Sequence, residues 1–527
     1  MTETDPAAVP ETGQPWLRLD PRMLLVHPVT EVVRYIPVLI GSVIVGARAE
    51  NPMWSLIPLV LIVGFALSRW FTTTYRVGPT HVELRTGLIQ RKRLAVPRSR
   101  IRSVDIEADL LHRVLGLAVL AIGTGQQADK GDKFKLDALD ARLVPQLRGE
   151  LLAHTAVTEG VAGQAISNAT PDASAARGRE IGHWRQEWVR YAPLSLTGFA
   201  IFAPIVGLAF QFGLGEVIFR SDAVHSVENG SALFIAGVIG ALLVALVLIV
   251  SLASCLRYLA TYYGLRVIDD GTTLHLRHGL FTKRQITMDL KRFRGATVNE
   301  PLLLRLAGAA ELEAIMTGEK PRVKILPQAP RAAVDHTLAH LLAPNGTQHP
   351  DAVRNPGVDI AKHSGTAQAA PGVVPLIQHG PVARRRRYIR TLVPVFALAI
   401  LLIAGLLAGV NFSPWWLLLP ALLVPLAIAL AEDRYRGLGH AVLPATATDP
   451  TWLVTRSGSL DRDRDCLESP GIIGWTVRQT FFQRRAGIAT VVAATAAGKR
   501  RYLVIDIPID QAWALIETVT PGRLGAR

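Results

Sequence analysis

Cysteine and charged residues are both scarce in this sequence. The 527 residues include only Cys255 and Cys466, which excludes a disulfide framework and a cysteine-based zinc site. Charged residues make up 19% of the chain, against about 25% in an average soluble domain. Hydrophobic residues reach 50%. An ordinary soluble enzyme is therefore not expected.

Motifs for catalysis are also missing. The sequence contains no Walker phosphate-binding loop, no His-Glu-x-x-His zinc motif and no Gly-x-Ser-x-Gly nucleophile elbow. Basic residues border apolar runs and alternate with acidic ones, which differs from the single basic stripe with aromatics of a nucleic-acid-binding surface. We expect no enzymatic activity, no cofactor, no metal ion and no nucleic-acid partner.

Long apolar runs are abundant. Crossing a bilayer takes roughly 20 mostly apolar residues, and six runs reach or approach that length. Short connections group them into three hairpins. The third hairpin follows four consecutive arginines and has no basic residue at its tip, and Lys and Arg favour the cytoplasmic side. The pattern predicts a multi-pass helical membrane protein with six spans, with its termini and large segments in the cytoplasm.

The polar segments between the hairpins form a repeat. Without gaps, the second copy matches the first at an offset of 192 residues, and the third matches at an offset of 371. The recurring positions are Gly87, Arg113 and Gly116, then Gly279, Arg305 and Gly308, then Gly458, Arg484 and Gly487. The third copy differs most, because an acidic cluster (Asp461, Asp463, Asp465 and Glu468) replaces much of its basic stretch.

Each copy predicts the same local structure. Two β-type runs flank Gly87, which supplies the positive φ of a hairpin turn. A short helical turn then ends at Gly116, where a left-handed residue closes a helix. Arg113 and Arg305 lie within this turn, and we expect them to brace the domain against the bilayer or a neighbouring loop. An amphipathic helix entered near a proline completes each copy, so the pattern predicts a small, partly open barrel.

These motifs resemble those of a known family. A membrane hairpin, a turn glycine with basic residues, then [Ile/Phe]-Arg-x-[Val/Ala] and Leu-Leu-x-Arg-x-x-Gly are similar to the membrane-flanked bacterial PH-like domain family (YdbS/YdbT-like). The larger members carry three such domains, and the resemblance extends from Met23 to Thr520. It implies a protein of the bacterial cytoplasmic (inner) membrane whose three PH-like β-barrels, each with a C-terminal helix, lie in the cytoplasm. The resemblance implies an architecture but no reaction.

The hairpins and repeats together predict the domain boundaries. We expect an N-terminal cytoplasmic tail (1–28), membrane hairpins at 29–70, 185–260 and 384–431, PH-like domains at 71–157, 261–343 and, in divergent form, 432–521, and linkers at 158–184 and 344–383. The three PH-like segments are called modules 1, 2 and 3 below.

Arginines and lysines form the candidate binding residues. Those expected to contact anionic headgroups or a partner are Arg91, Lys92, Arg93, Arg98, Arg100, Arg102, Arg384, Arg385, Arg386 and Arg387. Arginines on one strand face suit the phosphate oxygens of a specific headgroup. The same residues are also compatible with a general attraction to the membrane surface, with binding of a protein partner, or with a solvated sheet edge. For the four consecutive arginines, a topology signal is favoured over contact with anionic lipid.

The sequence therefore predicts a non-enzymatic scaffold or binding protein of the cell envelope. Its expected partners are anionic lipids of the inner leaflet and a membrane protein, such as a smaller PH-like membrane protein. The alternative is a component or regulator of a membrane transport or export system.

Overall fold

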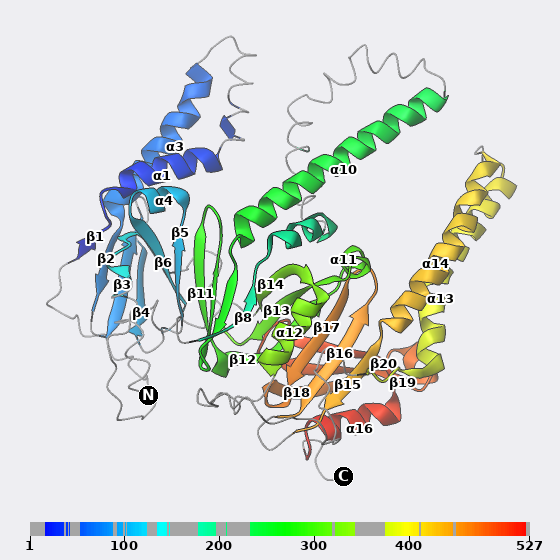
Figure 1. Ribbon diagram of the computed structural model, residues 1–527. Coiled ribbons are helices and arrows are strands. Elements are labelled where there is room, and N and C mark those ends of the chain that lie inside the picture. Colours follow the sequence, from blue (N-terminus) through cyan, green and yellow to red (C-terminus); the bar gives the residue numbers. More distant parts are fainter. Residues whose placement is uncertain are drawn as a thin grey trace, which may run out of the picture. The chain divides into compact units, whose positions relative to one another are not determined.

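In a computed structural model of the protein, antiparallel β-sheets and a few long helices predominate (Figure 1). The residues described are 16–35, 38–39, 42, 53–78, 80–87, 92–98, 101, 103–123, 134–144, 147, 178–195, 207, 232–318, 322–342, 375–410, 413–445 and 450–522. The chain divides into two compact units, Met1–Met288 and Asp289–Arg527.

Unit 1 contains module 1 and the first three strands of module 2. Its elements are β1 (Leu17–Arg18), α1 (Met23–Arg34), α3 (Met53–Thr72), β2 (Thr74–Val77), β3 (His81–Thr86), β4 (Lys92–Pro97), β5 (Ser103–Ala108), α4 (Leu110–Val114), β6 (Leu117–Gly123), β7 (Phe134–Asp140), β8 (Arg179–His183), the 3-10 helix η2 (Gln186–Ser195), α10 (Ala232–Tyr262), β9 (Arg266–Asp269), β10 (Thr273–His278) and β11 (Lys283–Asp289).

Unit 2 contains the remainder of module 2 and all of module 3. Its elements are η3 (Leu290–Arg292), β12 (Phe293–Asn299), α11 (Leu302–Leu306), β13 (Ala309–Met316), β14 (Arg322–Pro330), α12 (Arg331–Leu342), α13 (Gly380–Leu407), η5 (Pro414–Leu417), α14 (Leu418–Arg436), β15 (Gly439–Leu443), β16 (Trp452–Gly458), β17 (Arg462–Glu468), η6 (Ser469–Gly471), β18 (Ile472–Arg478), α15 (Phe481–Arg485), β19 (Ile488–Thr495), β20 (Arg501–Pro508) and α16 (Ile509–Val519).

The strands in the described residues form four antiparallel sheets. Unit 1 has a four-stranded sheet in the order β1-β2-β3-β4 and a seven-stranded sheet in the order β7-β6-β5-β11-β10-β9-β8. Unit 2 has a six-stranded sheet, β14-β13-β12-β17-β16-β15, and a three-stranded sheet, β18-β19-β20. The two larger sheets each combine strands from two successive modules.

Alternating side chains build the core of each module. In module 1, Val82 and Leu84 of β3 face inward with Leu120 of β6 and Leu136 of β7, as period-two patterning requires. In module 3, Leu453, Val491, Val504 and their neighbours form the corresponding core. The closing helix α16 covers it with Ala512, Leu515, Ile516 and Val519, which form the apolar face of the amphipathic helix expected there.

The turn glycines adopt the backbone that the repeat requires. Gly87, Gly279 and Gly458 have φ of 116°, 116° and 103°, and Gly116, Gly308 and Gly487 have φ of 70°, 69° and 66°. Residues with a Cβ rarely occupy this region, so each hairpin turn and each short helix end uses glycine. The matching angles show that the three copies share one local backbone course.

The expected six-span helical architecture is wrong. Within the described residues, three helices are long and apolar enough to cross a membrane: Gly240–Tyr262, Gly380–Leu407 and Trp415–Arg436. The apolar parts of α1 and α3 are shorter, at Met23–Val32 and Leu56–Thr72. In addition, Met23 and Val26 of α1, which lie in the expected N-terminal tail, are buried against Leu117. In the expected membrane hairpin at 185–260, residues 196–212 lie outside the described residues, apart from position 207.

The expected β-barrels are also wrong, because the sheets are open. Each module has a first set of three strands (β2–β4 in module 1) and a second set (β5–β7 in module 1). A barrel would need these two sets to pair along their facing edges. Instead, β5 of module 1 pairs with β11 of module 2, and β12 of module 2 pairs with β17 of module 3. Strand edges that could have closed a barrel are thus used to join successive modules.

Candidate functional site

The two strand pairings between modules share one geometry. Junction 1 is the pairing of β5 with β11, in which Glu107 faces Arg284. Junction 2 is the pairing of β12 with β17, in which Asn299 faces Asp463. Asn299 lies 192 residues after Glu107, which is the offset between the first and second copies of the repeat. Asp463 lies 179 residues after Arg284, which is the offset between the second and third copies. Equivalent residues therefore face each other in both junctions. The junction is therefore a repeated feature of the chain.

Backbone contact in junction 2 is close. A Cβ on Gly295 would lie 2.0 Å from the carbonyl oxygen of Cys466, so only glycine allows this approach. Beyond the strands, the backbone N–H of Glu300 donates to Arg462 O at 2.7 Å, and that of Leu302 donates to Leu460 O at 2.8 Å. These bonds continue the ladder as far as helix α11.

Side chains add a buried polar contact to junction 2. Thr297 Oγ1 on β12 donates to Asp465 Oδ1 on β17 at 2.7 Å, and both residues are buried. Burial raises the pKa of Asp465 to about 6, although the charge of Lys499 and the bond from Thr297 act in the opposite direction. Part of the acidic cluster that distinguishes the third copy thus lies at the junction.

The repeat arginine braces each junction. Arg113 Nη1 donates to Leu280 O at 3.2 Å, and Arg305 Nη1 donates to Ser459 O at 3.4 Å. Leu280 and Ser459 each follow the turn glycine of the next module. Of the two roles expected for this arginine, the described contacts are those of bracing against a neighbouring loop.

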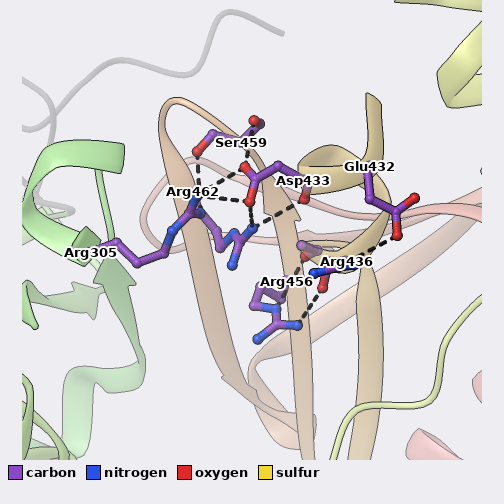
Figure 2. Close-up of polar contacts among 8 residues, drawn as sticks. Arg305, Glu432, Asp433, Arg436, Arg456, Ser459 and Arg462 are labelled. Carbon is purple, nitrogen blue, oxygen red and sulfur yellow. Dashed lines mark hydrogen bonds and ion pairs between the residues drawn. The ribbon is translucent and has the colours of Figure 1, made fainter. Parts of the chain in front are cut away.

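Arg305 also contacts the end of an apolar helix (Figure 2). Its Nη2 atom donates to both carboxylate oxygens of Asp433, at 2.9 and 3.0 Å, near the last turn of α14. Ser459 Oγ donates to the same carboxylate at 2.7 Å, and Arg462 Nη2 donates at 2.9 Å. Asp433 therefore connects α14, α11 and the turn before β17.

Arg456 completes this end of α14. Its Nη2 atom donates to Arg436 O at 2.8 Å, and its Nε atom donates to Gly437 O at 3.2 Å. A cation bonded to the last carbonyls of a helix satisfies groups that have no partner within the helix. Burial and the nearby charges of Arg464 and Arg462 lower the pKa of Arg456 to about 10, so it stays protonated at neutral pH.

The start of α13 is held on module 3 by a second carboxylate. Arg386 Nη1 and Arg387 Nη2 lie 3.1 and 3.0 Å from the two oxygens of Asp506. Asp506 is fully buried on β20, has a φ of 58°, and accepts a 2.7 Å hydrogen bond from Gln483 Nε2. Two of the four consecutive arginines therefore bind the protein's own carboxylate.

A buried histidine pair lies just before α13. The side chains of His379 and His440 are hydrogen bonded, with 2.9 Å between Nε2 and Nδ1. His379 Nδ1 also lies 2.7 Å from Ile505 O. Burial, with the nearby His379, lowers the pKa of His440 to about 4. The pair is therefore neutral at physiological pH and holds the segment before α13 against β15 and β20.

The predicted basic residues of module 1 do not form one exposed face. Arg98 is buried and donates to Gly78 O at 3.2 Å, while Arg93 lies 2.7 Å from Glu83 on the adjacent strand. Burial tends to raise the pKa of Glu83, but Arg93 and Arg76 lower it below its ordinary value. Lys92 is exposed at the edge strand β4. Arg91, Arg100 and Arg102 lie outside the described residues.

The other predicted arginines lie at the start of α13. Arg384 Nη2 is 3.0 Å from Glu432 on α14, and Arg385 is exposed. Exposed Arg390 and Arg434 lie near the same ends of α13 and α14, and sequence reasoning did not select them. It also missed Asp433 and Asp506, because nothing in the local sequence indicates which distant cation a lone carboxylate meets.

Comparison with known proteins identifies the repeated domain. The bacterial PH domain family matches twice, at residues 29–155 and 217–342. No curated protein and no solved structure matches the chain. Module 3 lies outside the matched residues, but its strands and closing helix follow the order β15 to β20 and α16, as β9 to β14 and α12 do in module 2. The chain therefore carries the bacterial PH domain in repeat.

Proposed function

We propose that this chain is a non-enzymatic, membrane-anchored scaffold that holds PH-like modules at the cytoplasmic face of the bacterial inner membrane. The observation that carries the proposal is the attachment of the apolar helices to module 3. Asp433 fixes the end of α14, and Asp506 fixes the start of α13. A helix inserted in a bilayer would thus position the module directly at the membrane surface.

The length and composition of three helices support membrane insertion. The candidate spans in α10, in α13 and at Trp415–Arg436 have mean hydropathy of 2.4, 2.3 and 1.9, and their apolar windows are 17%, 0% and 17% buried in the protein. An apolar helix surface of this size needs lipid or another apolar partner to cover it. We propose that lipid covers it.

The arginine distribution supports a cytoplasmic position for the modules. Exposed Arg385, Arg390 and Arg434 lie at the ends of α13 and α14 next to module 3. The opposite ends, around residues 408–414, contain no basic residue. This asymmetry is the one that orients membrane helices with their Lys- and Arg-rich ends in the cytoplasm.

These exposed arginines are the best candidates for contact with anionic headgroups. Arg386 and Arg387 already pair with Asp506, and Arg98 is buried, so we do not assign them this role. Each exposed cation near an anionic leaflet contributes about 1 kcal/mol of attraction. A small group of them supports surface attraction without requiring a specific headgroup pocket.

A lipid titration tests this proposal. Phosphatidylglycerol is added to the detergent-solubilised full chain, and binding is followed by native mass spectrometry. Removing two cations with Arg385→Gln and Arg390→Gln should weaken binding about 30-fold, since about 2 kcal/mol is lost.

The matched control removes two charges elsewhere, with Lys499→Gln and Arg501→Gln. Arg501 begins β20, five residues from Asp506, so its charge is roughly 16 Å further along the strand. The control should bind the anionic lipid as the parent chain does. Equal binding by all three proteins would contradict the anionic-lipid part of the proposal.

A further inference from the structure

In module 3, residues 474–478 of strand β18 pair with another described strand along one edge only. This strand, β18, occupies the position of β5 in module 1 and β12 in module 2, at the same repeat offsets. β5 and β12 each pair with the third strand of the following module. β18 pairs with β19, and no other strand in the described part of the chain lies beside it.

The backbone of β18 matches the backbone that docks in junction 2. β12 has a register irregularity between Phe293 and Gly295, and β18 has the equivalent one between Ile472 and Gly474. In junction 2 the N–H groups of Glu300 and Leu302 donate to the neighbouring module. Their equivalents are Gln479 and Phe481, and since N–H direction alternates along a strand, those of Trp475 and Val477 point to the same side.

Side chains beside this edge correspond to those that complete the other junctions. Arg484 corresponds to Arg113 and Arg305, which donate to the turn of the following module, and Arg484 is exposed. Phe481 and Phe482 next to it are 63% and 76% exposed. Edge strands are normally shielded by proline, lysine or covering segments, but β18 contains neither residue type.

The charge of Arg478 on β18 indicates which kind of strand can pair with this edge. In junction 1 the facing residues are Glu107 and Arg284, with a charged pair 3.8 Å apart. The equivalent residue on β18 is Arg478, which is exposed. A second copy of this chain would offer its own third strand, β4, and place Lys92 opposite Arg478. Like charges directly opposite in a sheet are destabilising, so the charges favour a different partner with an acidic residue there.

We propose that β18 is a docking edge for the third-strand edge of a PH-like module in another protein. The partner strand pairs antiparallel in the register of junctions 1 and 2 and carries Asp or Glu opposite Arg478. Arg484 then donates to the turn that precedes this strand. The inference deepens the scaffold role and rests on it, because it names the surface and the class of partner.

A peptide from this chain serves as the probe. Residues Ser459–Ser469 include β17, the strand that β12 binds, and in the shared register Asp463 would face Arg478. The fluorescein-labelled peptide is titrated against the detergent-solubilised full chain, and fluorescence anisotropy reports binding. Arg478→Glu in the chain should weaken binding about tenfold. A peptide with Asp463→Lys should bind that variant as well as the original peptide binds the parent.

A second variant tests the backbone. Val477→Pro removes an N–H that points away from β19, and proline is tolerated on an edge strand, so the fold should persist and binding should be lost. Circular dichroism checks the fold, and Arg501→Glu controls for a change of net charge. Should this variant fail to fold, the exchange of charges with Arg478→Glu in the chain and Asp463→Lys in the peptide still tests whether the peptide binds at β18.

Two outcomes would overturn the inference. One is peptide binding that neither Arg478→Glu nor Val477→Pro changes. The other is self-association of the full chain, measured by analytical ultracentrifugation, that Lys92→Glu strengthens, because that result assigns the edge to a second copy. The lipid titration with Arg385→Gln and Arg390→Gln does not involve β18, so failure of this docking edge and failure of the proposed function are distinguishable.

Discussion

Two carboxylates connect the apolar helices of unit 2 to its β-sheets. Asp433 lies between Arg305 and Arg462, and Asp506 lies between Arg386 and Arg387. Removing charges from water is costly, and the attraction between partners offsets this cost only when the geometry is good. Replacing one partner of such an ion pair is more destabilising than replacing both, because the remaining buried charge then lacks an opposite charge nearby. These residues should therefore tolerate substitution poorly.

Substitution of Arg305 tests this at the residue scale. Arg305→Ala removes the two bonds to Asp433 and the bond to Ser459, so the free energy of local opening should fall by about 1–3 kcal/mol. Hydrogen exchange of residues 459–462 in the full chain measures this opening. Arg113→Ala is the matched control, because exposed Arg113 makes one described bond, to Leu280. Its effect at residues 279–282 should stay below about 1 kcal/mol, and equal effects would contradict the assigned role of Asp433.

At the scale of elements, the choice of strand partner explains the acidic third copy. In the sequence, the acids of β17 look like loss of a basic motif. In the structure, Asp465 accepts a hydrogen bond from Thr297 of β12. Glu468 of β17 lies 3.3 Å from Arg294, which is also on β12. β17 is acidic where it meets β12, whereas β11 brings Arg284 toward Glu107 of β5. The two junctions share a register but not a charge pattern.

Junction 2 should respond to pH through Asp465. Its folded-state pKa of about 6 lies above the ordinary value of 3.8, so the folded protein binds the proton more tightly than the unfolded chain does. The contribution of Asp465 to stability is therefore present at low pH and is lost as the pH rises from about 4 to about 6.

Asp465→Asn isolates this contribution. The free energy of unfolding is measured by denaturant titration of the parent and the variant, and the variant is subtracted from the parent. The difference should fall between about pH 4 and pH 6 and be flat above that range. The subtraction is needed because His440, with its pKa lowered to about 4, contributes a slope of opposite sign in the same window. A difference that rises with pH would show that Asp465 is stabilised in its charged form.

At the scale of the whole molecule, membrane orientation is the main property to test. Ser413→Cys places a thiol at the exposed connection between α13 and α14, and Arg501→Cys places one on module 3. A membrane-impermeant maleimide added to intact cells should label position 413. Position 501 should be labelled only after permeabilisation. Labelling of position 501 from outside would contradict the proposed cytoplasmic position of the modules.

The native cysteines permit this experiment with one further change. Cys466 is fully buried, and burial raises the pKa of its thiol to about 12, so its reactive thiolate is scarce at neutral pH. Cys255 lies in α10 and is replaced by serine. A chain with Cys255→Ser alone should remain unlabelled in intact and permeabilised cells.

Local physics made part of this protein predictable from its sequence. Turn glycines, short helices and the stripe from Ala512 to Val519 depend on backbone conformation and side-chain period, which neighbouring residues determine. The apolar lengths of α10, α13 and α14 are likewise a property of consecutive residues. The packing of Met23 and Val26 of α1 on Leu117 was not predictable in this way, because it joins residues about 90 positions apart in the sequence.

Tertiary structure decided which groups meet. A strand edge offers the same N–H and C=O groups to any partner, so the sequence alone did not reveal that β5 and β12 pair with the next module. An arginine next to an apolar run can meet a headgroup or a buried carboxylate, and Arg387 meets Asp506, more than 100 residues away. Hydrogen bonds and ion pairs act over a few ångströms in space, whatever the separation along the chain, and this is why the junctions and the helix anchors became visible only in the folded chain.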